Sequence, residues 1–253
     1  MNNKKIYTVY GINNAEIVLR SDSCIIRDIF LDTNISSNSK IKKLISGNPF
    51  SRPVRSFDDY VKFNNSRNEQ RRSQGIVITF SFTGIQDSIL DFLGKKQDND
   101  CVLILDQLKD PQNLGQIIRT CECAGVNKII LTQNKSVKLS DSVLQVSQGA
   151  FCNISFYICN NLRNTLKILK EEGYWLVALE NSIESKNWYE IDLKGNIGII
   201  LGSEGKGIRR LTLEDSDFKA TIPMQGSTNS LNVSAACSII LFERLRQVLA
   251  DLN

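Results

Sequence analysis

The sequence contains no histidine. This absence excludes a Ser-His-Asp triad, a Cys-His dyad, a histidine general base and a zinc site of the Cys/His type. Histidine is the side chain that most often moves protons near neutral pH. An enzyme built from this chain must therefore handle protons with other groups.

Long apolar runs are also missing, because no stretch approaches the roughly 18 apolar residues that a transmembrane helix requires. Residues 1–10 lack the longer apolar stretch and the cleavage site of a signal peptide. We therefore expect a cytoplasmic protein without a membrane partner. The seven cysteines are scattered and odd in number, which is typical of reduced, packed thiols and argues against a disulfide framework or a metal site.

The remaining composition is that of a folded globular protein. Of the 253 residues, 42% are hydrophobic and 23% are charged, which suffices for one large domain or two modest domains with a real core. The net charge of +4 is compatible with a nucleic-acid partner but does not identify one, since many metabolic enzymes carry as much.

The apolar pattern predicts two domains and a linker. Residues 1–80 contain short apolar segments with helical or strand periodicity, which predict a small α/β domain. Residues 81–98 include a polar stretch without periodicity and are predicted to be a linker. The predicted second domain, residues 99–253, starts with the continuous apolar run Val102-Leu103-Ile104-Leu105, as expected for a strand buried on both faces.

Helices and strands alternate in this second domain. Helical segments are expected near 113–124, 139–149 and 161–172, and strands near 129–131, 175–179 and 197–201. The alternation predicts an α/β domain with a mostly parallel sheet. A last helix over about 231–249 carries an apolar stripe that core packing would explain: Ala235, Ile239, Phe242, Leu245 and Leu249.

Basic residues gather in the first domain. Such a cluster is either an ordinary solvated face or an electrostatic footprint for RNA phosphates. Its members are Lys40, Lys42, Lys43, Arg52, Arg55, Lys62, Arg67, Arg71 and Arg72.

The first of three candidate loops, residues 110–120, follows a buried strand and opens a helix. If Asn113 caps that helix, its side chain folds back over the N-terminus and both Asn113 and Arg119 can line one cleft. If both residues are fully helical, six positions correspond to about 600° of rotation and separate their faces. The alternative is that the two residues share no cleft: Asn113 then only caps the helix, and Arg119 is an ordinary surface residue.

The second loop, residues 201–208, has three glycines in six positions, which allow a sharp turn or a close approach to a ligand. It fits neither the P-loop nor the G-x-G-x-x-G spacing, and Glu204 would repel phosphates. The third loop, residues 222–236, leads small polar residues into an apolar helix. Ser230 or Asn232 could serve as its N-cap, or the polar groups could form a tight pocket for a polar ligand.

Together and in this order, the loops resemble the motifs of the SpoU (TrmH-type) branch of the SPOUT RNA methyltransferases. The matching stretches are N-L-G-Q-I-I-R-T at 113–120, L-G-S-E-G-K-G-I at 201–208 and I-P-M-Q-G-S-T-N-S-L-N-V-S-A-A at 222–236. Ser147-Gln148-Gly149-Ala150 resembles a shorter family stretch between the first two. We refer to the three long stretches as motifs one, two and three.

The resemblance covers residues 101–250 well and extends more loosely to residues 9–16 and 73–76. These last two segments resemble the small RNA-binding domain of the ribosomal RNA members, of which the branch acting on a 23S rRNA guanosine is closest. Relatives usually carry a histidine where this chain has Ser73.

The resemblance implies an α/β fold in two parts: a small N-terminal α/β RNA-binding domain (L7Ae/L30e-like) and a C-terminal SPOUT domain with a parallel sheet and a deep trefoil knot. Knots are rare exceptions to ordinary connectivity, and no periodicity in the sequence indicates one. The resemblance also implies a homodimer through the catalytic domain, an active site at the subunit interface, and no metal.

The implied reaction is methyl transfer from S-adenosyl-L-methionine to a ribose 2′-hydroxyl, in 23S rRNA. Arg119 is expected at this hydroxyl, where a guanidinium, with a pKa above about 12, is a poor base but can bind phosphate and stabilise alkoxide charge. Asn113 and Ser230 are expected to orient ribose and phosphate. Glu204 and Asn232 are expected either to fix the knot loops or Arg119, or to be purely architectural.

The resemblance also assigns binding residues. Backbone groups near the motif-two and motif-three loops are expected to hold the cofactor, at Leu201, Gly202, Gly207, Ile222, Leu231 and Ser234. Independently of the resemblance, the charge of the basic cluster suggests RNA contacts in the first domain, at Lys42, Lys43, Arg52, Arg55, Arg71 and Arg72.

Two alternatives stay open at this point. One is a transfer-RNA 2′-O-methyltransferase, against which the resemblance of the first domain argues. The other is an RNA-binding protein of the same fold that has lost catalysis, against which the presence of Arg119 and Ser230 argues.

Overall fold

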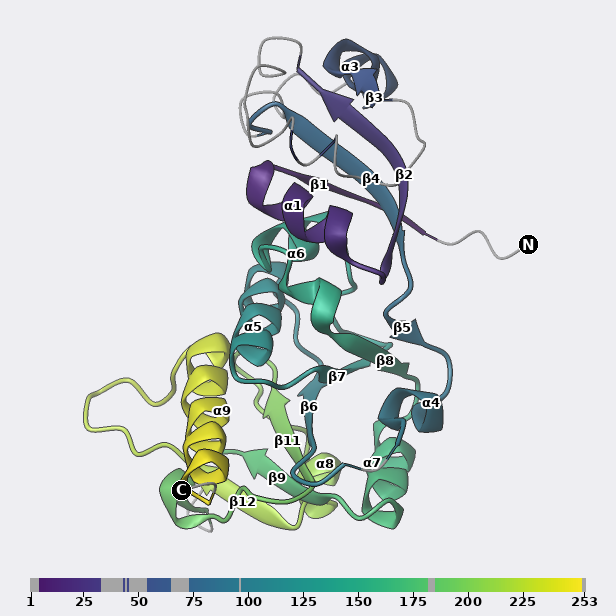
Figure 1. The fold of residues 1–253 in the computed structure, drawn as a ribbon. Helices are drawn as coiled ribbons and strands as arrows, with labels where there is room; N and C mark the ends of the chain where they lie inside the picture. The colour runs from purple at the N-terminus through teal and green to yellow at the C-terminus, as the bar shows by residue number, and fades with distance from the viewer. Residues whose placement is uncertain are drawn as a thin grey trace. The chain divides into compact units, whose positions relative to one another are not determined.

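The structure is a computed structural model that describes residues 5–32, 43, 45, 54–64, 73–95, 97–181 and 185–251. The chain forms two compact units (Figure 1). The first comprises Met1–Gly84 and Leu139–Cys152, and the second comprises Ile85–Lys138 and Asn153–Asn253. Both units are α/β, and no helix in the described part of the chain is long and apolar enough to cross a membrane.

The first unit contains a four-stranded sheet in the order β1-β4-β2-β3. β4 is antiparallel to both of its neighbours, and β3 is parallel to β2. Nearly every residue of β4 is buried, which fits its central place in the sheet. The elements are β1 (Ile6–Tyr10), α1 (Ile12–Arg20), β2 (Cys24–Leu31), β3 (Val54–Ser56), α3 (Phe57–Asn64) and β4 (Ile76–Phe82).

Ser73, at the position where relatives carry histidine, lies in the turn before β4. Its side chain is fully buried, and its carbonyl accepts hydrogen bonds from the backbone of Gly11 and Ile76 at 3.1 Å each. Its hydroxyl oxygen accepts from the Gly75 backbone at 3.1 Å. The serine therefore closes a turn against the start of α1.

The segment 139–152 completes the first unit from a distant part of the sequence. It forms α6 (Asp141–Val146) and a 3-10 turn, η2 (Ala150–Asn153). The Gln145 amide exchanges two hydrogen bonds with the Tyr10 backbone, at 3.0 and 2.9 Å. The Phe151 ring stacks on Phe80 at 5.7 Å, and a Cβ on Gly149 would lie 2.6 Å from Ile17. The short family-like stretch 147–150 therefore packs against α1.

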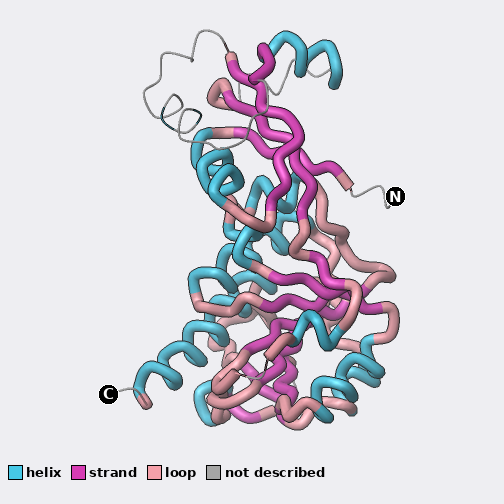
Figure 2. The backbone as a smooth tube through the Cα atoms, turned by 45° about the vertical axis from the view of Figure 1, so that its right-hand side comes forward, coloured by secondary structure: helices cyan, strands magenta, loops and turns pink. Residues whose placement is uncertain are grey.

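The second unit contains an eight-stranded sheet in the order β10-β12-β9-β11-β6-β7-β8-β5, with every recorded pairing parallel. Its strands are among those drawn in magenta in Figure 2. β6 and β7 are buried along their whole length, as their continuous apolar runs predict. This sheet confirms the predicted α/β fold with a parallel sheet. The strands are β5 (Ile85–Gln86), β6 (Cys101–Asp106), β7 (Lys128–Thr132), β8 (Ser155–Cys159), β9 (Trp175–Leu179), β10 (Lys186–Asn187), β11 (Ile197–Gly202) and β12 (Phe218–Thr221).

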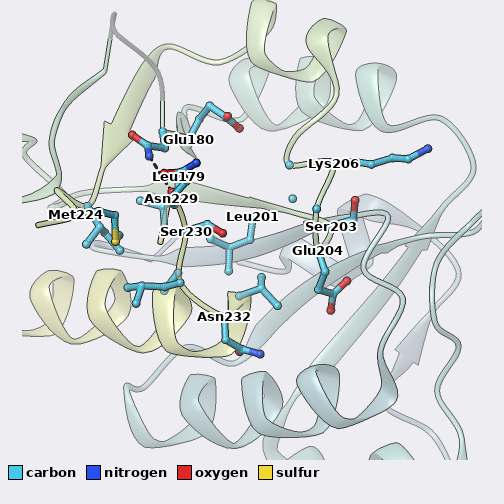
Figure 3. Close-up of a pocket in the computed structure, with 18 residues that line it drawn as sticks. Leu179, Glu180, Leu201, Ser203, Glu204, Lys206, Met224, Asn229, Ser230 and Asn232 are labelled. Atoms are coloured by element: carbon cyan, nitrogen blue, oxygen red, sulfur yellow. Dashed lines mark hydrogen bonds between the residues drawn. The ribbon is translucent and has the colours of Figure 1, made fainter. Parts of the chain in front are cut away.

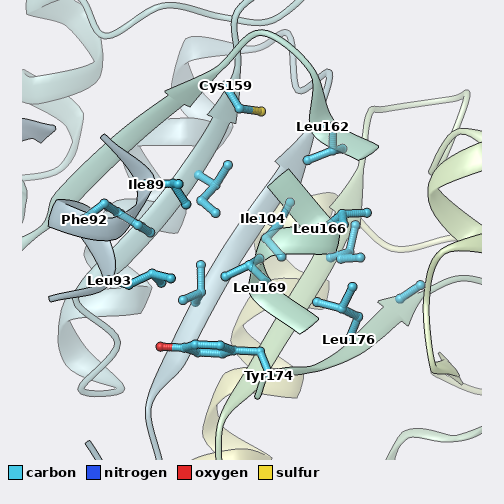
Figure 4. Packing of buried hydrophobic residues seen from close by; sticks show 14 of the residues in the cluster. Ile89, Phe92, Leu93, Ile104, Cys159, Leu162, Leu166, Leu169, Tyr174 and Leu176 are labelled. Carbon is cyan, nitrogen blue, oxygen red and sulfur yellow. The ribbon is translucent and has the colours of Figure 1, made fainter. Parts of the chain in front are cut away.

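Helices cover both faces of this sheet (Figure 1). α4 and α7 bury Phe92, Leu166 and Leu169 against it, together with Ile104 and Leu176 of the strands (Figure 4). α5 and α9 pack against each other on the other face. The helical elements are α4 (Ile89–Leu93), α5 (Pro111–Cys123), α7 (Leu162–Glu171), η3 (Trp188–Glu190), α8 (Arg210–Glu214) and α9 (Val233–Ala250).

The segment predicted as a linker, residues 81–98, contains ordered elements. It includes the end of β4, then β5 and α4. Ile89, Phe92 and Leu93 of α4 are buried in the core of the second unit. A single helical turn is too short for periodicity to identify, although its apolar spacing of three and four is that of a helix face.

The expectation that the apolar stripe of the last helix packs into the core was wrong. Phe242 and Leu249 of α9 are 47% and 49% exposed, and Ala235 is also exposed. The buried face of α9 instead contains Cys237, Ile240, Leu241 and Arg244. Because α9 is apolar on two faces, periodicity alone could not decide which of them turns inward.

Candidate functional site

The sheet topology of the second unit brings motifs one and two to one edge. β6 and β11 are parallel neighbours, and their last residues, Asp106 and Gly202, are register partners. Motif one begins a few residues beyond β6, and motif two leaves β11 directly. Loops at the carboxyl ends of adjacent parallel strands are where open α/β sheets bind ligands.

The motif-two loop closes tightly on itself. Ser203 and Gly207 exchange two backbone hydrogen bonds, at 3.1 and 3.0 Å. Gly205 and Gly207 have φ values of +76° and +64°, which favour glycine. A Cβ on Gly202 would lie 2.1 Å from the Gly207 carbonyl carbon, so position 202 admits no side chain while the loop keeps this shape.

Asn113 bridges motifs two and three. The N-cap of α5 is Asp110, whose carboxylate accepts from the Gln112 backbone at 2.8 Å, so the reading of Asn113 as a cap was wrong. Asn113 is buried in the first turn of the helix. Its Nδ2 donates to Glu204 Oε1 at 2.6 Å, and its Oδ1 accepts from Asn232 Nδ2 at 3.0 Å.

Asn232 extends this network to the start of α9. It is the N-cap of α9, where its Oδ1 accepts from the Ser234 backbone at 2.8 Å. The Ser234 hydroxyl lies 2.6 Å from Asn232 Oδ1 and 2.8 Å from Gln116 Oε1, and its one proton can serve either acceptor. The chain of contacts therefore runs from Glu204 through Asn113 and Asn232 back to α5.

Arg119 lies apart from this network. Its side chain is exposed on α5, and it has no hydrogen-bond or ion-pair partner among the residues that the structure describes. Asn113, six positions earlier, is buried on another face, as the six-residue spacing predicts for two helical residues. Gln116, one turn before Arg119, contacts Ser234, so this part of α5 lies beside the start of α9.

Motifs two and three and the end of β9 line a pocket of about 650 Å³ (Figure 3). Three residues expected to act in catalysis, Glu204, Ser230 and Asn232, contribute to its wall. The residues expected to hold a cofactor there are Leu201, Gly202, Gly207, Ile222 and Leu231. Ser234, Asn113 and Arg119 do not line this pocket, and the first two reach it only through Asn232 and Glu204.

Three pocket residues outside the motifs, Leu179, Glu180 and Asn181, were not identified from the sequence. Glu180 and Asn181 follow β9 and line the pocket. Oε2 of Glu180 would lie 3.1 Å from a Cβ on Gly207, so the carboxylate borders the motif-two loop. The Asn181 amide donates to the Asn229 carbonyl at 3.0 Å, which ties β9 to motif three. Their place at the carboxyl end of a buried strand was the available signal.

The hydrogen bonds of Asn232 lead us to expect that this residue contributes to the free energy of unfolding. Replacing Asn232 with alanine removes the cap of α9 and leaves the buried Asn113 carbonyl without its donor, so we expect a loss of about 1–3 kcal/mol in the free energy of unfolding. Asn229→Ala, in the same loop, should cost less than about 0.5 kcal/mol, because among the described residues only the backbone carbonyl of Asn229 has a hydrogen-bond partner. Urea unfolding measures both, and equal losses would refute the bridging role of Asn232.

Most of the basic residues expected to contact RNA lie outside the described residues, namely Lys42, Arg52, Arg71 and Arg72. Of the other two, Lys43 is exposed, and Arg55 on β3 lies 3.4 Å from Asp28. Among described residues, no group of three or more Cys, Asp or Glu side chains could hold a metal ion.

Comparison with known proteins gives one family. The profile described as "SpoU rRNA Methylase family" matches residues 100–242. A Coxiella burnetii protein named 23S rRNA (guanosine-2'-O-)-methyltransferase RlmB is 35% identical over 246 residues, 96% of each chain. A Staphylococcus saprophyticus relative assigned to TrmH family tRNA/rRNA methyltransferases is 44% identical over 60% of this chain, which spans 61% of that relative's length.

The fold is shared with solved structures. The SpoU methyltransferase AviRb from Streptomyces viridochromogenes, solved in complex with the cofactor AdoMet, superposes with a TM-score of 0.81 over 97% of this chain and 91% of its own. The two sequences are 17% identical, so this likeness concerns the fold.

Proposed function

Because the chain belongs to the SpoU rRNA methylase family, we propose that it transfers a methyl group from S-adenosyl-L-methionine to a guanosine 2′-hydroxyl in 23S rRNA. The observation that carries the proposal is the joining of three distant motifs by Asn113, Glu204 and Asn232 beside one pocket. A protein with this substrate works in the cytoplasm.

The pocket suits this cofactor in size and charge. Its volume of about 650 Å³ lies within the usual range of small-molecule sites, about 300–1,000 Å³. Glu180 and Glu204 place two carboxylates in the wall against one ammonium, that of Lys206, and the other lining residues are neutral. Such a wall fits a cation with an adenosine and disfavours a polyphosphate. When bound, the cofactor supplies a methyl group already activated on a sulfonium.

The chain's own residues then position the nucleophile. Arg119 has no partner for its guanidinium within the described ranges, and we expect it to bind a phosphate beside the target ribose and to stabilise the developing alkoxide. Ser230 is exposed at the pocket and is free to orient the ribose. Both polar atoms of the Asn113 amide are occupied in the network, so we assign Asn113 a positioning role that acts through Glu204 and Asn232.

The first unit favours ribosomal RNA over transfer RNA. The match to the Coxiella burnetii RlmB extends over 96% of this chain and therefore includes both units, whereas the family profile covers only residues 100–242. We infer that residues 1–80 help to select the RNA, with Lys42, Lys43, Arg52, Arg55, Arg71 and Arg72 as its contacts.

A direct test incubates the full-length protein with radiolabelled S-adenosylmethionine and either 23S rRNA or bulk transfer RNA. We expect label in 23S rRNA alone, resistant to alkali at the linkage next to the methylated ribose. Label in transfer RNA alone would select the transfer-RNA alternative. Cofactor binding without any transfer would select the alternative of an inactive RNA-binding protein.

We also infer the family's trefoil knot in the second unit. β11 lies between β6 and β9, and the chain continues through β12 before α9 returns to pack on α5. A return of this kind past strands already in place is what a knotted connection requires. The loops of motifs two and three would then form the knot around the pocket.

The outward apolar face of α9 supports a homodimer through the second unit. Ala235, Phe242 and Leu249 are exposed at helical spacing on one face, and a second copy of this chain is the occupant that we propose for it. Phe242→Asp should therefore convert a dimer of about twice 28.5 kDa into a monomer, as measured by light scattering at micromolar concentration. Leu211→Asp, at an exposed leucine of α8, is the matched control and should leave the dimer intact. A wild-type monomer with full activity would refute the shared site.

A further inference from the structure

Several lysines of the second unit are paired with acidic side chains and others are not. At the edge where the strands begin, Lys128, Lys170 and Lys194 form ion pairs with Asp100, Asp217 and Asp251 at 2.6, 2.8 and 3.1 Å. At the edge where the strands end, Lys109, Lys135 and Lys138 are exposed and have no ion-pair or hydrogen-bond partner within the described ranges. Lys95 and Lys186, nearer the edge where the strands begin, are likewise exposed without such a partner, so what distinguishes the motif edge is that these three unpaired lysines stand on neighbouring loops next to motif one.

Two loops carry these three lysines, and hydrogen bonds hold the loops together. The Val137 backbone donates to the Leu108 carbonyl at 2.7 Å. The Gln107 backbone donates to the Thr132 hydroxyl at 3.2 Å, and that hydroxyl also bonds Ser136. Lys109 follows Leu108 and Lys138 follows Val137, so one backbone hydrogen bond brings these two lysines side by side.

Backbone conformation marks both loops as well. Gln107 and Lys135 have φ values of +62° and +59°, in the left-handed region that residues with a side chain rarely adopt. Such conformations cost energy, persist only where surrounding contacts impose them, and cluster at functional sites. Here the hydrogen bonds between the two loops hold the backbone in these conformations, and the backbone that carries the three lysines is therefore fixed.

No carboxylate among the described residues forms an ion pair with these three lysines. The carboxylate next to Lys109 belongs to Asp110 and is engaged as the N-cap of α5. Lys109 precedes Asn113 by four residues, so the charged loops lie at the start of the helix that bears Arg119. A flexible ammonium is a point charge that suits phosphate contacts without reading base identity.

We propose that Lys109, Lys135 and Lys138 form a phosphate-binding surface in the second unit that holds the substrate RNA backbone next to motif one. The surface is separate from the basic cluster of the first unit. The identity of the RNA rests on the proposed function, whereas the charge of the three lysines and the geometry of their loops do not depend on that function.

The test removes three charges at once from the full-length protein. We expect K109Q/K135Q/K138Q to lower the slope of log affinity against log salt by about 2 for single-stranded poly(A), since each contact contributes about 0.7. If variant and wild type converge at 1 M salt, the affinity loss in 0.1 M salt is roughly 100-fold. The control K167Q/K170Q/K194Q changes the net charge equally at three lysines that are already paired, and its slope should match the wild type.

The outcomes separate this surface from the proposed function. Equal slopes for both triple variants, or wild-type affinity in the first, would overturn the surface. Calorimetric titration with S-adenosylmethionine should give the wild-type affinity in both variants, because none of the six lysines lines the pocket. RNA binding that depends on the three lysines without methyl transfer would refute the proposed function alone. Transfer to 23S rRNA with an unchanged KM in K109Q/K135Q/K138Q would refute the surface alone.

Discussion

Arg119→Ala is expected to lower kcat for RNA methylation by about 10²- to 10³-fold, the usual effect of removing one donor that stabilises developing charge. The reason is that Arg119 is the cation of motif one, without a partner among the residues that the structure describes, in a chain without histidine. Cofactor affinity should stay within a few-fold of wild type, because Arg119 does not line the pocket. Single-turnover transfer and calorimetric titration measure the two quantities.

The control arginine is Arg163, which is exposed on α7 and forms a bidentate ion pair with Asp215. Arg163→Ala should leave kcat near wild type, and near-wild-type turnover in Arg119→Ala would remove Arg119 from the mechanism. Arg119→Lys tests the role itself. A lysine keeps the charge but loses the planar fork, so we expect a partial rate at all pH values. A lysine variant faster than wild type at alkaline pH would indicate a general base instead.

Gly202→Val is expected to weaken S-adenosylmethionine binding by on the order of 100-fold or more, a change equivalent to about 2.7 kcal/mol. A Cβ at position 202 would lie 2.1 Å from the Gly207 carbonyl carbon and 2.3 Å from the Ile208 nitrogen. Both are backbone atoms, which cannot rotate away as a side chain can. The loop must therefore open and break the Ser203–Gly207 pairing that shapes the pocket wall.

Gly226→Ala is the matched control for this loop substitution. Gly226 lies in motif three, and a Cβ there would meet nothing within 4 Å, so the affinity should change little. Circular dichroism and thermal unfolding establish whether each variant is folded. A folded Gly202→Val protein with wild-type cofactor affinity would place the cofactor elsewhere.

The sequence by itself determined the buried strands and the order of the motifs. Val102–Leu105 and Ile197–Leu201 are continuous apolar runs, and a strand covered on both faces requires such runs whatever its neighbours are. The three motifs could also be recognised, because each follows a strand or opens a helix. Turns at such places favour glycine, asparagine and serine. The absence of histidine excluded whole mechanisms without any structure.

The partners of the polar site residues were decided by the tertiary structure. Asn113 sits at a position that suits a cap, but its contacts are Glu204 and Asn232, 91 and 119 residues away. The assignment of Glu180 and Asn181 to the pocket likewise depends on β9 lying beside β11 in the sheet. Local sequence patterns describe which side chains share a face or a turn, whereas such pairings arise from the strand order.

The tertiary structure also decided which apolar surfaces are buried by other elements. Residues 139–152 belong to the first unit because Gln145 and Phe151 pair with Tyr10 and Phe80, more than 60 residues away. The apolar stripe of α9 is exposed because its opposite face, also apolar, packs on α5. Helical periodicity reports that a face is apolar, but whether another element covers that face depends on the path of the whole chain.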